Sequence, residues 1–519
     1  MNKTSIPVAR GDKTKVLAAI CLSAVIIPLV FTGPAISTVA VGRDLGGNQS
    51  ALSWIVNAYA IAFGSCVMAA GAIGDQIGRK RCFVAGLWIF ILTSLLIGLT
   101  PNLLLLNLLR AAEGMGGALV LTSATSLLAQ EFEGAERTRA FSFLGTAFGV
   151  GLAFGPMTSG LLILHLGWRS LYFAIALMAF LILFLGTKRI KESRAPNAQG
   201  IDWPGTVLFT TTLVLLTFGI VYGPQDGWAS LKVLSILGGA ALLLGIFIVV
   251  ERRRTHPMLD LSLFRYPRFI GVQLLPVATG FSFIALIVYV PNWFITIQGR
   301  DAFTAGLAIL PLTAPMLVVP LLAGRLAQYL SPGLLSGIGF FISALGTWLL
   351  IDLSPNGSLW AMTIPLLLIG IGNGLPWGLM DALSVSVVPK ERAGMAAGIF
   401  TTMRVAGEAI AIAAIGATLL SLAAGNLRTA AEAHSLSLVE NATVIASQIG
   451  TRSEQRSSIH AVSATDKVLT ELTHRAYTAA FHSVFAVLAI LSVLTAVICI
   501  LTLRKPTDAP EKNLGASAP

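Results

Sequence analysis

Long apolar runs, separated by short polar and charged stretches, make up most of this chain. An α-helix rises about 1.5 Å per residue, so roughly 20 apolar residues are needed to cross about 30 Å of hydrocarbon. Fourteen runs come near this length. They cover residues 16–41, 51–73, 82–100, 103–129, 139–164, 169–187, 204–222, 231–250, 269–293, 303–323, 332–351, 359–386, 395–423 and 479–503. The pattern predicts an all-α polytopic membrane protein with 14 transmembrane helices.

Charged residues are scarce and lie mainly between these runs. They form 11% of the 519 residues, against about 25% in soluble domains. The net charge of +11 comes from cations in short loops without a sustained basic face, which argues against nucleic-acid binding. An even number of spans places both termini on one side, and that side carries 24 of the 35 Lys and Arg residues, against 9 on the other. Because short cytoplasmic loops are enriched in cations, we expect both termini in the cytoplasm.

The loop between the second and third runs carries the most specific pattern. Residues 71–81 contain Gly71, Asp75, Gly78, Arg79 and Lys80. Glycine permits a close approach and a positive φ in a tight turn, and a carboxylate accepts hydrogen bonds from an arginine or a helix N-terminus. All five positions match the loop G-x-x-x-D-x-x-G-R-[RK] of the major facilitator superfamily, which this sequence therefore resembles. The resemblance implies a gating role for this signature loop.

The fifth run adds a second resemblance. It carries Gly151, Gly155, Pro156 and Gly160, which are similar to the antiporter signature G-x-x-x-G-P-x-x-G-G of exporters in the same superfamily. Ser159 replaces the first glycine of the final pair. Glycines four residues apart give a smooth face for close helix packing, and a proline bends or weakens a helix. An ordinary packing face would show the same spacing, so the position of this run between the neighbouring motifs favours the antiporter interpretation.

The resemblance covers nearly the whole chain and is closest to the fourteen-span drug:proton antiporter family of the EmrB/QacA type. It implies the major facilitator fold, with two six-helix bundles plus two inserted helices. Glu136-Arg137 recurs as Glu391-Arg392, 255 residues later, as expected for parallel repeats. The expected parts are a cytoplasmic tail at 1–15, an N-terminal six-helix bundle at 16–188, an inserted two-helix pair at 203–250, a C-terminal six-helix bundle at 269–503 that includes a long extracytoplasmic loop at 424–478, and a cytoplasmic tail at 504–519.

Five ionisable residues inside the predicted spans are candidates for proton coupling, because a charge in the membrane is costly and marks function. Arg110 and Glu113 are three residues apart in a segment that resembles the superfamily's R-x-x-Q-G block, with Glu113 in place of glutamine. Arg404 and Glu408 are four residues apart, and both spacings place a pair on one helix face. Burial favours a protonated carboxyl group and a nearby arginine favours an ionised one. Asp381 has no cation near it in sequence, so we expect it to be the carboxyl group most readily protonated. Static pairs that only orient helices remain the alternative.

Aromatic and amide side chains on three of the spans are candidates to line a substrate cavity. Such a set suits an amphipathic aromatic compound, although membrane-interface and core positions explain many Trp and Tyr residues equally well. The candidates are Asn57, Tyr59, Tyr289, Asn292, Asn373 and Trp377. The first span has no acidic residue between Leu29 and Ile36, where cation exporters of the family commonly carry an aspartate, so the charge of the substrate stays open.

The resemblance implies a proton-coupled secondary transporter that exports lipophilic or amphipathic compounds from a bacterial cytoplasm by alternating access. It would lie in the cell (inner) membrane, need no cofactor and no metal, and catalyse no covalent reaction, since no phosphate-binding glycine-rich loop is present for ATP. The expected partners are a small-molecule substrate, protons and the lipid bilayer. We expect a functional monomer, with a periplasmic adaptor protein left open. Export of an endogenous metabolite, lipid-like molecule or siderophore is the alternative, and a sensor or scaffold is disfavoured by the intact Asp75, Arg110 and Gly155-Pro156.

Overall fold

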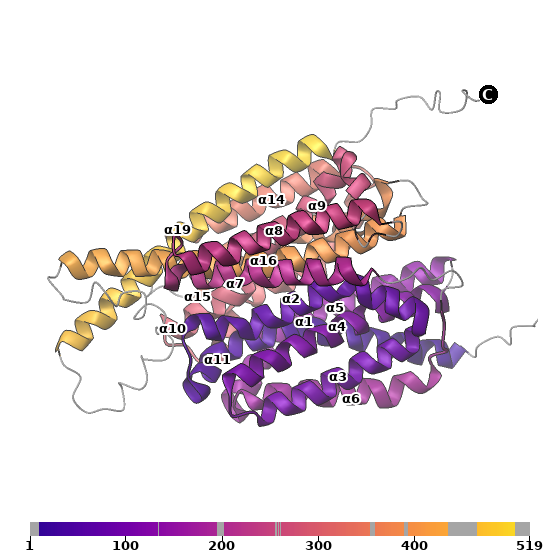
Figure 1. The fold of residues 1–519 in the computed structure, drawn as a ribbon, viewed down its shortest axis with the longest axis horizontal. Helices are drawn as coiled ribbons and strands as arrows, with labels where there is room; N and C mark the ends of the chain where they lie inside the picture. The colour runs from indigo at the N-terminus through magenta and orange to yellow at the C-terminus, as the bar shows by residue number, and fades with distance from the viewer. Residues whose placement is uncertain are drawn as a thin grey trace, which may run out of the picture.

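A computed structural model describes residues 10–503, apart from residue 133, 195–201, 255–256, 258, 260, 353–358, 389–392 and 434–463. Within these ranges the chain forms helices and their connections, without a strand (Figure 1). Thirteen of the described helices are long and apolar enough to cross a membrane, and the shorter apolar helix Arg169–Phe184 lies at the sixth predicted span. The chain is therefore a multi-pass membrane protein, and the predicted all-α class is confirmed.

The first bundle has six long helices. Asn48 and Asn102 cap two of them, because their side-chain oxygens accept backbone N–H groups of the first helical turn. Within the bundle α2 packs against α4, α1 against α5, and α3 against both α4 and α6. A 3-10 helix, η1 (Thr187–Arg189), follows and leads to the buried Ile190. The six helices are α1 (Arg10–Leu45), α2 (Gln49–Ile77), α3 (Arg79–Leu99), α4 (Leu103–Glu131), α5 (Gly134–Leu166) and α6 (Arg169–Gly186).

Helices α7 (Trp203–Asp226) and α8 (Leu231–Arg253) cover one seam between the two bundles. α7 packs against α2 of the first bundle and against α16 (Ala393–Ala433) of the second, while α8 packs on α7 (Figure 1). Phe209 and Leu213 of α7 belong to an apolar cluster that also contains side chains of α2, α8 and α16. The pair thus closes the α2–α16 seam from the side.

The second bundle contains less regular helices. A 3-10 helix, η2 (Leu261–Arg265), precedes a long rod whose middle is π-helical. The rod consists of α9 (Pro267–Thr279), the π-helix η3 (Gly280–Ile284) and α10 (Ala285–Thr296). The other long helices are α14 (Pro332–Leu349), α15 (Leu359–Ser386), α16 and α19 (Ala464–Thr502).

The span predicted as one helix over 303–323 is broken, which corrects that prediction. It is divided into α11 (Ala302–Ala308), α12 (Leu310–Thr313), the 3-10 helix η4 (Ala314–Leu317) and α13 (Val319–Leu326). Pro311, Pro315 and Pro320 lie in this stretch. A proline has no backbone N–H and its ring clashes with the preceding helical turn, so three prolines interrupt the hydrogen-bond ladder repeatedly.

The loop predicted at 424–478 is in part helical continuation of its neighbours. α16 extends to Ala433 and α19 begins at Ala464, so both spans project as a pair beyond the bundle, at the left of Figure 1. Buried Leu427 and Leu472 belong to this pair, and Asn426 Nδ2 donates to the Ala476 carbonyl oxygen at 3.2 Å. The described parts of this predicted loop are extensions of the spans, and residues 434–463 lie outside the described ranges.

The two bundles meet closely at one end of the molecule. We call the end where α1 begins and α19 ends the terminal face, and the opposite end the distal face. Near the distal face, a Cβ atom added to Gly160 of α5 would lie 2.3 Å from the Ala302 carbonyl oxygen, and one added to Gly306 would lie 2.5 Å from the Pro156 carbonyl oxygen. Toward the terminal face, α5 makes no substantial contact with α13 in the described ranges, and a Cβ atom at Gly145 would meet open space. The bundles are therefore closed at the distal face and separate toward the terminal face on this side.

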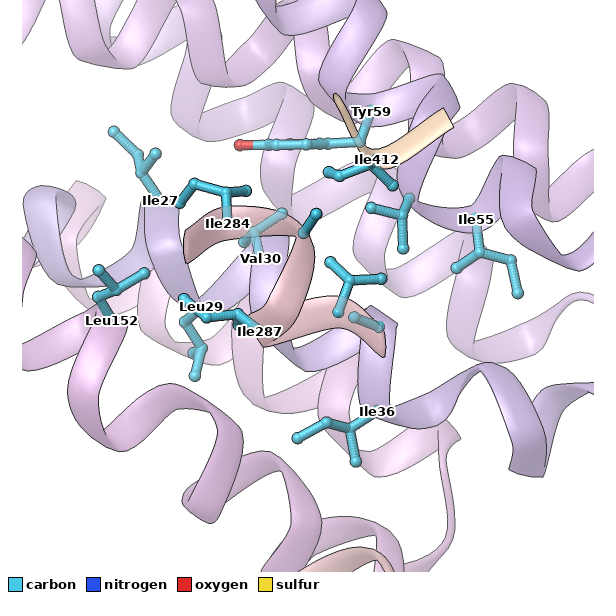
Figure 2. Close-up of a cluster of buried hydrophobic side chains, with 14 of the residues drawn as sticks. Ile27, Leu29, Val30, Ile36, Ile55, Tyr59, Leu152, Ile284, Ile287 and Ile412 are labelled. Atoms are coloured by element: carbon cyan, nitrogen blue, oxygen red, sulfur yellow. The ribbon is translucent and has the colours of Figure 1, made fainter. Parts of the chain in front are cut away.

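Apolar side chains fill the contact between the bundles at its centre. Figure 2 shows Leu29 and Val30 of α1 beside Ile284 and Ile287 of the second bundle, within one hydrophobic cluster that also includes Ile412 of α16. Hydrophobic contact is non-directional, and it requires no specific polar partner to be broken and remade when surfaces separate. The arrangement thus gives a largely apolar seal. It is crossed by a hydrogen bond from Thr313 Oγ1 of α12 to the Ala153 carbonyl oxygen of α5, at 3.0 Å.

Candidate functional site

The signature loop is a tight turn at the terminal face, between α2 and α3. Gly78 stands between the two helices with φ of +129°, in a region that L-residues rarely adopt. Asp75 Oδ1 accepts two hydrogen bonds from Arg79, from Nε at 2.9 Å and from Nη2 at 2.7 Å. The structure thus brings Asp75, Gly78, Arg79 and Lys80 into one turn, whereas a Cβ atom at Gly71 would meet open space. In this conformation the Asp75 carboxylate is bound within its own loop.

Arg110 and Glu113 of α4 form an ion pair in the interior of the first bundle, as their spacing predicts. Both side chains are fully buried. Arg110 Nε donates to the Ile55 carbonyl oxygen of α2 at 2.7 Å, and Nη2 donates to the Val30 carbonyl oxygen of α1 at 3.0 Å. Ser94 of α3 donates to Glu113 Oε1 at 2.6 Å. Two buried charges therefore bind four helices together and leave neither charge uncompensated.

Small residues around this pair explain why the helices approach so closely. A Cβ atom at Gly114 would lie 2.4 Å from the Tyr59 carbonyl oxygen, and one at Gly117 would lie 2.9 Å from the Tyr59 hydroxyl. The ring of Tyr59 lies 4.5 Å from Arg110 Cζ, within the range of a cation–π contact. Glycine at these positions thus allows α2 to pack the Tyr59 ring against the Arg110 guanidinium. In this state Tyr59 therefore packs on the ion pair.

The antiporter-like helix α5 makes two different contacts. Its middle packs inside the first bundle, because Cβ atoms at Gly151 and Gly155 would lie 2.3 Å from the Val25 carbonyl oxygen and 2.8 Å from Thr32 Oγ1 of α1. Its distal part, with Pro156 and Gly160, contacts α11 of the second bundle. The glycine series therefore serves both the packing of one bundle and the contact between bundles, which also includes Gly149, where a Cβ atom would lie 3.2 Å from the Met316 carbonyl oxygen.

The charged residues of the second bundle pair differently from the prediction. Arg404 Nη1 contacts Asp381 Oδ1 at 3.2 Å, so the cation of α16 reaches α15 and not Glu408 one turn away. The Asp381 side chain is 66% exposed. The expectation that Asp381 is unpaired and strongly desolvated is therefore wrong, because a long arginine side chain can reach a neighbouring helix as easily as its own. Trp377 contributes an aromatic ring whose centroid lies 6.0 Å from Arg404 Cζ.

Glu408 is the acid that this pairing leaves without a counter-ion. It is partly buried on α16, and it has no hydrogen bond or ion pair with any other described residue. α16 packs here against the π-helix η3: a Cβ atom at Gly280 would lie 3.3 Å from Glu408 Cα. Single π-helical turns occur frequently at functional sites. This π-helical turn could not be predicted from the sequence, because no residue pattern distinguishes it from an ordinary helical turn.

The predicted cavity residues do not gather in one place. Asn57 and Tyr289 line one cavity between the bundles, together with Tyr477 and residues of α16. Within the described ranges the fully buried Asn57 amide has no partner, whereas the Tyr289 hydroxyl donates to the Ile412 carbonyl oxygen at 2.8 Å. The space for centres of water-sized molecules is about 30 Å³, enough for about two waters. The cavity is thus narrow in this state.

The other cavity candidates have separate surroundings. Asn373 is buried in a polar cluster of the second bundle, where Ser282 donates to its Oδ1 at 2.6 Å and its Nδ2 donates to Ser343 Oγ at 2.9 Å. Its amide is satisfied by protein, which argues for helix packing and against a cavity wall. Asn292 of α10 is partly buried, and Trp377 lies beside Arg404.

Sequence comparisons place these features among known proteins. A family model described as "Major Facilitator Superfamily" matches residues 18–412. The chain is 30% identical over 378 residues to the "Multidrug resistance protein Stp" of Mycobacterium tuberculosis, covering 73% of this chain and 70% of that protein. It is 28% identical to the "Tetracenomycin C resistance and export protein" of Streptomyces glaucescens, covering 79% and 77%. It is 33% identical to the "Cephamycin export protein CmcT" of Amycolatopsis lactamdurans, covering 75% and 82%.

Solved structures share the fold. A bacterial homologue of the human lysosomal transporter Spinster, crystallised in an inward-facing and unoccupied conformation, superposes with a TM-score of 0.65 at 14% identity, covering 96% of this chain and 100% of that chain. A peptide transporter in complex with sulfate superposes with a TM-score of 0.61 at 13% identity, covering 95% and 96%. At such low identity these likenesses establish the arrangement of helices alone.

Proposed function

Since the chain belongs to the Major Facilitator Superfamily, we propose that it is a proton-coupled multidrug exporter of lipophilic or amphipathic compounds. It is a transporter, and the resistance and export proteins it resembles support movement of substrate out of the cell. The terminal face lies toward the cytoplasm, because its loops and tails carry 24 of the 35 Lys and Arg residues. The distal face then lies outside. On the α5 side the bundles are closed toward the outside and separate toward the cytoplasm, whereas α2 and α16 stay in contact as far as Met68 and Gly398.

Alternating access requires the closed face to open and the open face to close. The contact of α5 with α11 and the apolar seal at the centre hold the distal face closed here. At the terminal face the Asp75 carboxylate is bound to Arg79 of its own loop. It can exchange this partner for one on the second bundle when that bundle approaches. The proposed cycle thus breaks an apolar contact at one end and makes a charge-assisted contact at the other.

The surroundings of Glu408 support proton coupling most directly. A driving proton must bind in one orientation of the transporter and leave in the other, so its carrier needs surroundings that change. Glu408 is partly buried beside a π-helical turn near the contact between bundles and has no cation within ion-pair distance among described residues. Glu113 is held by Arg110 and Ser94, and Asp381 is exposed and paired. Glu408 is therefore the proposed proton carrier, with Arg404 and Asp381 as its charged neighbours.

The test compares two assays in reconstituted vesicles. Glu408→Gln should lose proton-driven transport and keep counterflow, in which substrate exchanges without a gradient. Glu432→Gln is a matched control, because Glu432 lies on the same helix but is exposed and paired with Arg428. It should behave as wild type in both assays. Gradient-driven export by Glu408→Gln at the wild-type rate would refute this assignment, and uptake of substrate by the wild type would refute the direction of transport.

Export of an endogenous product is a second candidate. The relatives from Streptomyces and Amycolatopsis are named for resistance to, or export of, tetracenomycin C and cephamycin. Deleting the gene in its host and comparing metabolites inside and outside the cell would identify such a substrate, which should accumulate inside.

A further inference from the structure

The segment that connects the first bundle to α7 carries a carboxylate that binds the signature loop. The buried Ile190 anchors this linker in the first bundle, and Glu192 follows two residues later. Glu192 accepts the backbone N–H of Lys80 at 3.1 Å and that of Arg81 at 3.2 Å. The Arg79 N–H donates to the Ser193 carbonyl oxygen at 3.0 Å. These three N–H groups open α3 and have no partner inside the helix.

α3 depends on this linker because it has no side-chain cap of its own. Its cap residue is Gly78, and no side chain near it in sequence binds the first turn. A carboxylate at a helix N-terminus also interacts favourably with the helix dipole. The Glu192 side chain is 33% exposed, and Arg81 Nε lies 3.8 Å from it as a further cation. The cap that usually comes from the preceding residue therefore comes here from a residue more than a hundred positions later.

The same carboxylate occupies the space beside the glycine of the signature. A Cβ atom at Gly78 would lie 2.6 Å from both Glu192 Cδ and Oε1. Two features therefore require glycine at position 78. One is its φ of +129°, and the other is the carboxylate that packs against its Cα. Arg79, the first residue of α3, is held by its backbone to the linker and by its side chain to Asp75.

We propose that Glu192 is a positioning residue of the signature loop: it caps α3 from the linker and so fixes the register in which Asp75 and Arg79 pair. The inference rests on the proposed function, in which Asp75 changes partner during the transport cycle. Loss of the cap loosens the turn but leaves Asp75, Arg110 and Glu408 chemically intact. The maximal transport rate should therefore fall about five- to tenfold, the usual worth of one helix cap, while KM for substrate stays unchanged.

Hydrogen exchange on the full-length protein tests the cap independently of transport. In Glu192→Ala the amides of residues 79–82 should exchange about five- to tenfold faster than in wild type. Glu192→Gln keeps one acceptor oxygen and should show a smaller effect, which also covers the case in which the alanine variant folds poorly. Glu136→Ala is the matched control, because Glu136 is another exposed carboxylate at the terminal face, paired with Lys13 at 3.6 Å. Unchanged exchange in both Glu192 variants would overturn the proposal.

A double-mutant cycle with Gly78→Ala tests the contact itself. In the wild-type background the new Cβ atom meets the carboxylate and the φ strain, and in Glu192→Ala it meets only the φ strain. The transport defect caused by Gly78→Ala should therefore be smaller in the Glu192→Ala background. Strict additivity would overturn the proposed contact. If Glu192→Ala shows faster exchange but a normal transport rate, Glu192 does cap α3. The gating function of the loop is then refuted instead.

Discussion

The contact between Gly160 and α11 gives a quantitative test of how the distal face closes. In Gly160→Ala the new Cβ atom would lie 2.3 Å from the Ala302 carbonyl oxygen and 2.8 Å from Phe303 Cα, and both atoms belong to the backbone. Backbone cannot rotate away as a side chain can, so the bundles must separate. Overpacking of a close contact costs about 1–3 kcal/mol. The strain exists only while the distal face is closed, so it shifts the equilibrium toward the state that is open at this face.

The expected shift is large enough to measure by labelling. A change of about 1–3 kcal/mol alters the ratio of the two states about 5- to 150-fold. Asn57→Cys in a cysteine-free background is a suitable reporter, because Asn57 is fully buried between the bundles in the closed state. An impermeant maleimide added from outside should label this cysteine faster in Gly160→Ala than in the parent, and export should slow because the inward-open state becomes rarer.

Two glycines of the same helix supply the controls. Gly145→Ala adds a methyl group to open space, so labelling should not change. Gly151→Ala meets the Val25 carbonyl oxygen at 2.3 Å inside the first bundle, so it should lower thermal stability without favouring either face. Equal labelling rates for Gly160→Ala and Gly145→Ala would refute the idea that this contact closes the distal face.

Three further substitutions test the charged residues. Asp75→Asn weakens the bonds to Arg79 and should nearly abolish transport at a normal level in the membrane, measured as flux together with expression. Glu113→Gln leaves the buried Arg110 without its counter-ion and should lower the free energy of unfolding by about 3–5 kcal/mol, measured by thermal unfolding in detergent; unchanged stability would contradict the buried pair. Asp381→Asn breaks a partly exposed ion pair, so stability should change by less than about 1 kcal/mol in the same assay.

The membrane spans could be predicted from the sequence, because a long apolar run in a chain with so little charge forms few structures other than a membrane-spanning helix. The pairing of Arg110 with Glu113 was also predictable, since a spacing of three residues places both side chains on one helix face. The breaks between α11 and α13 were visible in principle in Pro311, Pro315 and Pro320. Apolar composition over 303–323 concealed them, because hydropathy measures the solvent preference of a segment and not its backbone geometry.

The partner of Arg404 could not be predicted, because it depends on which helix lies beside α16. The arginine side chain reaches Asp381, 23 residues earlier in the chain, and its own i+4 neighbour loses the pair. The linker contact of Glu192 was equally hidden: the residue stands in a basic segment with no motif, and only the fold places it at the start of α3. Contacts between elements far apart in sequence require their relative placement, which residue spacing within one helix does not contain.

The two bundles differ in how firmly they hold their charges, and this difference bears on where coupling occurs. In the first bundle Arg110 and Glu113 are fully buried and bonded to four helices, so moving either charge would break several bonds at once. A partner removed from such a pair costs several kcal/mol, which makes the pair a poor carrier of a proton in every cycle. The second bundle has a π-helical turn, a helix broken by prolines and Glu408 without a counter-ion in the described ranges. Backbone of this kind can change shape at low cost. We therefore expect the proton to be carried in the second bundle, and the first to act as the rigid part against which it moves.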